Sequence, residues 1–169
     1  MTSRNFTRLA ALGGTAALVV VGTLILGSGL TARAHSEGTE SHNGLAGAWR
    51  LQVTVRDCQT GVAQRTFPAL FTFANGGTLT VTTAGQFPAL STPGLGVWRH
   101  SDDGSYSAVF EAFVFSPAGA WIQTHRVTRA IEIGNDPDEF TDTVKLEIFG
   151  TTGNLIATGC ATSVARRFE

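Results

Sequence analysis

Short runs of β-branched and aromatic residues, separated by clusters of turn-forming residues, fill the chain from Gly44 onward. Within these runs apolar residues recur at every second position, which is the period of a strand with one buried face. No helical repeat of 3.6 residues interrupts them. The pattern therefore predicts an all-β domain. Its expected strands are 47–56, 65–73, 78–83, 94–100, 106–115, 121–133, 139–149 and 155–167.

Eight strands with mostly short connections form either an up-and-down barrel or a sandwich. Two residue pairs favour the barrel. Opposite residues in antiparallel strands have numbers that add to a constant, and the pairs Cys58–Cys160 and Trp49–Arg167 have nearly equal sums. One register between the first and last strands therefore accommodates both pairs. We predict a closed, eight-stranded antiparallel barrel whose seam carries a Cys58–Cys160 disulfide, the alternative being two free, buried thiols.

The N-terminal segment has the composition of an export signal. Arg4 and Arg8 precede an uncharged run, 9–30, and Ala32-Arg33-Ala34 provides the small residues that signal peptidase accepts. We predict that residues 1–34 are a signal peptide; an uncleaved membrane anchor is the alternative. The protein would then be secreted or periplasmic. Residues 35–44 are expected to form a flexible polar leader, and residues 45–169 the barrel domain.

Charge excludes several classes of partner. Without its first 34 residues the chain keeps nine of its 12 Lys and Arg and all 13 Asp and Glu, a formal charge of −4. Nucleic acids and anionic membranes require clustered positive charge, so we expect neither as a partner of the mature domain. The sequence contains no CxxC pair, phosphate-binding loop or nucleophile elbow. We expect no metal and no cofactor.

Gly47-Ala48-Trp49 resembles the Gly-x-Trp signature of lipocalins and related calycins, and Arg167 stands where such barrels place an arginine across that tryptophan. The resemblance extends to strand number and order, and it implies a barrel that holds a small hydrophobic molecule. The lipocalin loop motif of Thr-Asp-Tyr type and a C-terminal helix are absent, and the domain is short. Barrels similar to allene oxide cyclase or streptavidin therefore remain alternatives.

The expected sixth strand is unusual because one of its faces mixes polar and apolar residues. If its odd-numbered positions point inward, Gln123, His125 and Arg129 enter the barrel. A buried guanidinium needs a partner, for which Glu111 and Asp142 are the candidates. The sequence leaves open which face Glu111 takes. Trp98 either lines the cavity or fills the core.

These residues support three hypotheses. The first is a secreted binding protein that holds a hydrophobic ligand with a polar or carboxylate end through Gln123, His125, Arg129, Trp98, Glu111 and Asp142. The second is a barrel enzyme, such as an isomerase or cyclase, that uses His125, Arg129 and a carboxylate. The third is a filled barrel without a ligand, in which Arg129 only satisfies an acidic partner. We favour the binding protein.

Overall fold

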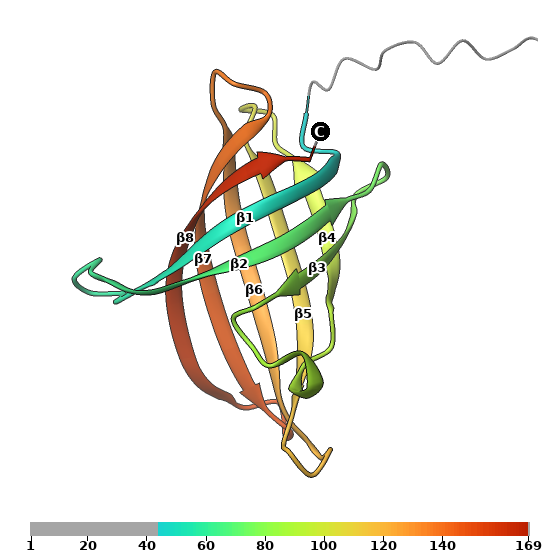
Figure 1. Cartoon of the computed structure of the whole chain (residues 1–169), viewed down its shortest axis with the longest axis vertical. Coiled ribbons are helices and arrows are strands. Elements are labelled where there is room, and N and C mark those ends of the chain that lie inside the picture. Colours follow the sequence, from blue (N-terminus) through green and yellow to red (C-terminus); the bar gives the residue numbers. More distant parts are fainter. Residues whose placement is uncertain (1–43, 169) are drawn as a thin grey trace, which may run out of the picture. The chain divides into compact units, whose positions relative to one another are not determined.

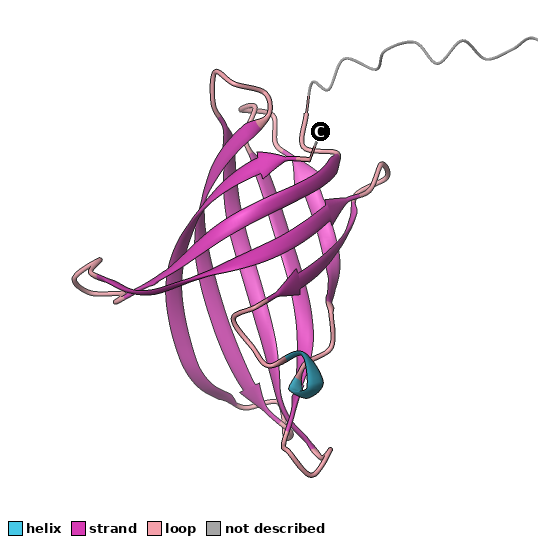
Figure 2. Cartoon of the chain, viewed as in Figure 1, coloured by secondary structure: helices cyan, strands magenta, loops and turns pink. Residues whose placement is uncertain are grey.

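The computed structural model describes residues 44–168, and most of them belong to strands (Figure 2). The strands form one closed antiparallel barrel in chain order (Figure 1), as predicted. The only helical element described is the short 3-10 helix η1, Pro88–Leu90. The segment predicted to be a signal peptide and most of the predicted leader lie outside the described residues. The strands are β1 (Gly47–Arg56), β2 (Ala63–Phe73), β3 (Thr78–Thr83), β4 (Gly94–His100), β5 (Tyr106–Phe115), β6 (Trp121–Ile133), β7 (Glu139–Gly150) and β8 (Leu155–Arg167).

Two strand boundaries differ from the prediction. Strand β2 begins at Ala63, two residues earlier than expected, because a bulge after Val55 lets Arg56 pair with Ala63 and extends the ladder. Strand β7 continues by one residue to Gly150. Neither change alters which side chains point inward.

The seam between β1 and β8 has the predicted register. Trp49 pairs with Arg167 and Arg56 pairs with Cys160. Just beyond the end of β1, Cys58 forms a disulfide with Cys160, and their Cα atoms are 5.2 Å apart. The disulfide therefore links the first and last strands, 102 residues apart in sequence.

One end of the barrel is plugged by the segment that precedes β1. Leu45 and Trp49 are fully buried, and the Trp49 indole Nε1 donates to the Leu45 carbonyl at 2.9 Å. The Arg167 guanidinium stacks on the Trp49 ring at 4.2 Å and donates to the Ala46 carbonyl at 2.6 Å. A side chain at Gly47 would collide with Arg167, since a Cβ there would lie 2.7 Å from Nη1. The glycine, tryptophan and arginine thus form one packed unit, as the lipocalin resemblance implied.

Aromatic side chains fill the interior next to this plug. Phe140 contacts both Trp49 and Phe73, with ring centroids 4.8 Å and 6.2 Å apart. Phe71 continues the cluster toward Phe110. On β1, β2 and β7 the buried residues recur at every second position over most of each strand, which is the period that the sequence predicted. Among residues 44–168 no helix is long and apolar enough to cross a membrane.

Candidate functional site

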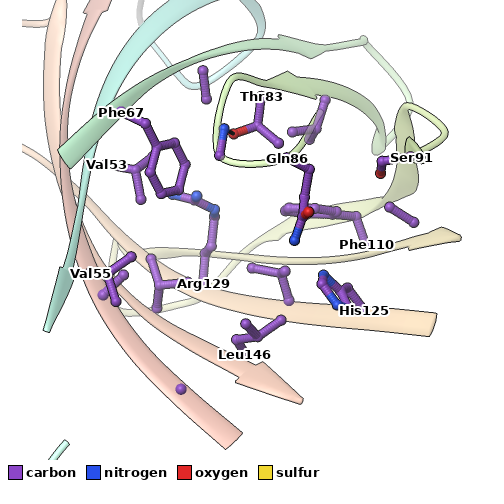
Figure 3. Close-up of a pocket in the computed structure, with 18 of the residues that line it drawn as sticks. Val53, Val55, Phe67, Thr83, Gln86, Ser91, Phe110, His125, Arg129 and Leu146 are labelled. Atoms are coloured by element: carbon purple, nitrogen blue, oxygen red, sulfur yellow. Dashed lines mark hydrogen bonds between the residues drawn. The ribbon is translucent and has the colours of Figure 1, made fainter. Parts of the chain in front are cut away.

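The half of the barrel away from the plug contains a cavity of about 150 Å³. Its mouth lies beside the β3–β4 connection, which contributes Gly85, Gln86 and Ser91, and Thr83 lines it from the end of β3 (Figure 3). A neighbouring hollow of about 480 Å³, lined by Arg65 and residues 84–88, shares Arg65, Gly85 and Gln86 with the cavity. The walls are mainly apolar. They include Val53, Val55, Phe67, Ala69, Phe71, Val81, Phe110, Ala112, Val127, Val144, Leu146 and Ala161.

Arg129 is the buried charge of this cavity. It lies on β6 with 4 % of its surface exposed, and its Nη1 donates to Asp142 Oδ2 and, at 2.9 Å, to Ser163 Oγ. Its guanidinium also stacks on the Phe71 ring at 4.6 Å. Burial lowers the pKa of Arg129, while the charge of Asp142 acts in the opposite direction. Asp142 is therefore the partner of Arg129. It is one of the two candidates that the sequence offered.

The ion pair uses only one edge of the guanidinium. Arg129 Nε is buried without any hydrogen-bond acceptor, and Asp142 Oδ1 is buried without a donor. No described residue accepts a hydrogen bond from Arg129 Nη2. Nε and Nη2 form the edge of an arginine that binds a carboxylate through two parallel hydrogen bonds. A buried donor without an acceptor costs about 1–3 kcal/mol, so an acceptor that reaches this edge is favoured.

His125 lines the cavity four residues before Arg129 on the same strand. Burial lowers its pKa from the ordinary value of 6.5, so the imidazole is neutral at pH 7. Its Nε2 lies 3.2 Å from Gln123 Oε1. Because an amide oxygen only accepts hydrogen bonds, Nε2 carries the proton, and Nδ1 is left as an acceptor. The structure thus forms two separate pairs, Gln123 with His125 and Arg129 with Asp142. His125 and Arg129 line the cavity, whereas Gln123 and Asp142 support them from outside its lining.

Two predicted site residues lie elsewhere. Glu111 points out of the barrel, where it accepts a 2.7 Å hydrogen bond from Arg126 Nε, so it is not the partner of Arg129. Trp98 packs against Phe73 and Tyr106 and does not line the cavity. Its indole Nε1 donates to the Ala74 carbonyl at 3.0 Å. Trp98 therefore takes the core position that the sequence left as its alternative.

Sequence reasoning missed the polar residues at the mouth. Gln86 enters the cavity from the β3–β4 connection (Figure 3). Arg65 lies near the start of β2, with its guanidinium 5.1 Å from the centre of the Phe67 ring. A connection has no strand period that assigns its residues to a face. The only feature of the sequence that could have pointed to Gln86 was the unusual length of the connection 84–93. Among the described residues, no group of three His, Cys, Asp or Glu side chains could hold a metal ion.

The lowered pKa of His125 predicts a loss of stability in mild acid. The unfolded chain binds a proton near pH 6.5, whereas the folded protein resists protonation until lower pH. The contribution of His125 to stability is therefore present above pH 6.5 and is lost as the pH falls below it. We expect His125→Phe to flatten the pH dependence of the free energy of unfolding between about pH 7.5 and pH 5. Urea denaturation at several pH values measures the free energy of unfolding of both proteins. If it falls equally with pH in the wild type and in His125→Phe, the pH dependence does not come from His125.

No protein-family model and no curated protein sequence matches this chain. The functional assignment therefore rests on the geometry and chemistry of the cavity.

Proposed function

We propose that the barrel is a binding protein for a small, mainly apolar molecule that ends in a carboxylate. The observation that carries the proposal is the unpaired edge of Arg129 at the wall of an apolar cavity. A carboxylate placed there would give Nε and Nη2 the two parallel acceptors that they lack. The apolar walls would cover the rest of the ligand.

The cavity volume limits the size of the ligand. Pockets for drug-sized molecules measure roughly 300–1,000 Å³, and this cavity measures about 150 Å³. An apolar cavity of roughly 150 Å³ accepts a molecule the size of benzene. We therefore expect a ligand with one ring, or an aliphatic chain of similar bulk, whose outer end reaches the mouth.

The charges around the cavity favour an anion. Two guanidinium groups line it, Arg129 inside and Arg65 at the mouth, and no carboxylate is among its lining residues. Asp142 lies behind Arg129 with a fully buried side chain and balances only one of the two positive charges. A ligand carboxylate would therefore enter a site of net positive charge.

The same geometry supports catalysis less well. The enzyme hypothesis places a carboxylate beside His125 and Arg129, within hydrogen-bond reach of the substrate. Asp142 is covered by Arg129, and Glu111 lies outside the barrel. The filled-barrel alternative describes the plugged half of the interior and leaves the cavity in the other half without a role.

The cellular location belongs to the proposal as well. A disulfide persists in oxidising compartments and is rare in the cytosol, and the Cys58–Cys160 bond links the first and last strands of this barrel. Together with the export signal predicted for residues 1–34, this supports a secreted or periplasmic binding protein.

Calorimetric titration with benzoate and benzyl alcohol tests the proposed function. We expect benzoate to bind more tightly because only benzoate can accept both hydrogen bonds from Arg129. A variant that removes the charged pair together, Arg129→Met/Asp142→Leu, is expected to weaken benzoate binding about 10- to 100-fold, the value of a charge-assisted hydrogen bond of about 1.5–3 kcal/mol. Benzyl alcohol affinity is expected to change little.

A second ion pair, between Arg126 on β6 and Glu111 on β5, provides the control. Arg126 and Glu111 face solvent, with about half of each side chain exposed (48 % and 42 %), so Arg126→Met/Glu111→Leu is expected to keep wild-type affinity for benzoate. Equal benzoate affinity in the wild type and in the Arg129→Met/Asp142→Leu variant would refute the carboxylate site. Absence of any binding would refute the binding protein.

A further inference from the structure

We infer that the ligand is a hydroxy acid, with its carboxylate on Arg129 and its hydroxyl group held at the mouth by His125 and Gln86. This inference rests on the proposed function, which concerns only the carboxylate. It adds a second polar contact at the opposite side of the cavity, and so it defines the class of ligand.

His125 provides an acceptor for a hydroxyl hydrogen. Its Nε2 is occupied by Gln123 Oε1, which fixes the proton on that nitrogen. The second nitrogen, Nδ1, has no hydrogen bond within the described part of the chain. A neutral imidazole held in this tautomer accepts a hydrogen bond from a hydroxyl group but does not attract a second carboxylate. The ligand group that lies at the mouth is therefore expected to be an uncharged hydrogen-bond donor.

Gln86 is turned into the cavity although its neighbours are exposed. Ala84 lies on the surface and Phe87 is 76 % exposed, whereas Gln86 is half-buried and lines the cavity. Figure 3 shows its amide directed toward the space between Phe110 and His125. The amide makes no hydrogen bond to another described residue. It can donate to the oxygen of a hydroxyl group whose hydrogen goes to His125.

The spacing on β6 sets the length of the ligand. Arg129 and His125 lie four residues apart on one face of the strand, which places their Cα atoms about 13 Å apart. Side chains stand roughly perpendicular to a sheet. Two hydrogen bonds of about 2.9 Å then leave roughly 7 Å between the two polar groups of the ligand. A single ring with a carboxylate and a hydroxyl group at opposite positions spans this distance.

Three probes test the inference by calorimetric titration: benzoate, 4-hydroxybenzoate and 4-fluorobenzoate. The hydroxyl and fluoro compounds have similar size, but only the hydroxyl group donates a hydrogen bond. We expect 4-hydroxybenzoate to bind about 3- to 10-fold more tightly than the other two, as one added hydrogen bond of about 1 kcal/mol implies. In His125→Phe this advantage is expected to disappear, so that the ratio of the 4-hydroxybenzoate affinity to the benzoate affinity falls to about one.

His100→Phe is the matched control, because His100 stacks on Tyr106 outside the cavity lining; it should retain the preference for 4-hydroxybenzoate. The ¹⁵N resonances of His125 give a second readout. We expect a neutral imidazole protonated at Nε2 whose Nδ1 resonance shifts on addition of 4-hydroxybenzoate and not of 4-fluorobenzoate. Equal affinities for the three probes, or an advantage that survives His125→Phe, would overturn the hydroxy acid and leave the carboxylate site standing. Failure of all three to bind would overturn both.

Discussion

Arg129→Met is expected to lower the free energy of unfolding by about 3–5 kcal/mol, because it leaves a buried carboxylate without its cation. The side chain of Asp142 is fully buried, and Arg129 supplies its hydrogen bond. Ser163 Oγ loses its 2.9 Å contact with the guanidinium in the same variant. Urea denaturation of the oxidised protein, followed by far-UV circular dichroism, measures the change.

Two further variants show whether Arg129→Met destabilises the protein because Asp142 loses its cation or because the arginine side chain itself is missing. Arg129→Met/Asp142→Leu removes both charges and is expected to recover stability to within about 1 kcal/mol of the wild type. Arg126→Met breaks the solvent-exposed pair with Glu111 and is expected to cost less than about 1 kcal/mol. A single variant Arg129→Met as stable as the wild type would show that Asp142 does not depend on Arg129.

The second large effect is expected at the seam. Replacing both cysteines, Cys58→Ser/Cys160→Ser, should lower the free energy of unfolding by about 4 kcal/mol, because the crosslink closes a loop of about 100 residues in the unfolded chain. The two cysteines are 102 residues apart in sequence, so strands β2 to β7 and the start of β8 lie within that loop. The midpoint of urea denaturation, compared between the variant and the oxidised wild type, gives the value.

Reduction of the wild type provides the control. The reduced protein should denature at nearly the same urea concentration as the serine variant and should gain two hydrogens in intact mass. Equal midpoints for the oxidised wild type and the serine variant would contradict a stabilising role. Two alkylatable thiols in the native protein would contradict the disulfide itself.

The fold was predictable because strand period and turn chemistry agree along most of the chain. Alternation assigns the inner face of β1 and β2, where large apolar residues recur at every second position. The pairs Cys58–Cys160 and Trp49–Arg167 then fix how the first strand meets the last. A closed barrel follows from that contact alone.

The site was predictable only in part. Gln123, His125 and Arg129 stand out because they are the polar residues on a face of β6 whose other residues are apolar. The side taken by Glu111 was not predictable, because both faces of β5 are apolar: Phe110 is buried, whereas Phe113 is 48 % exposed on the outer wall. Gln86 lies in a connection without a period. The size of the cavity depends on how side chains from several strands pack, which no local pattern specifies.

A crystal structure of the protein with bound benzoate tests the central claim most directly. We expect the ring to lie among Phe67, Phe71 and Phe110, and the two carboxylate oxygens to lie about 2.7–2.9 Å from Arg129 Nε and Nη2. Arg129 Nη1 should keep its contacts with Asp142 and Ser163. A barrel without benzoate in which Arg129 Nε instead bonds to Asp142 Oδ1 would contradict the account, as would benzoate found only in the outer hollow beside Arg65.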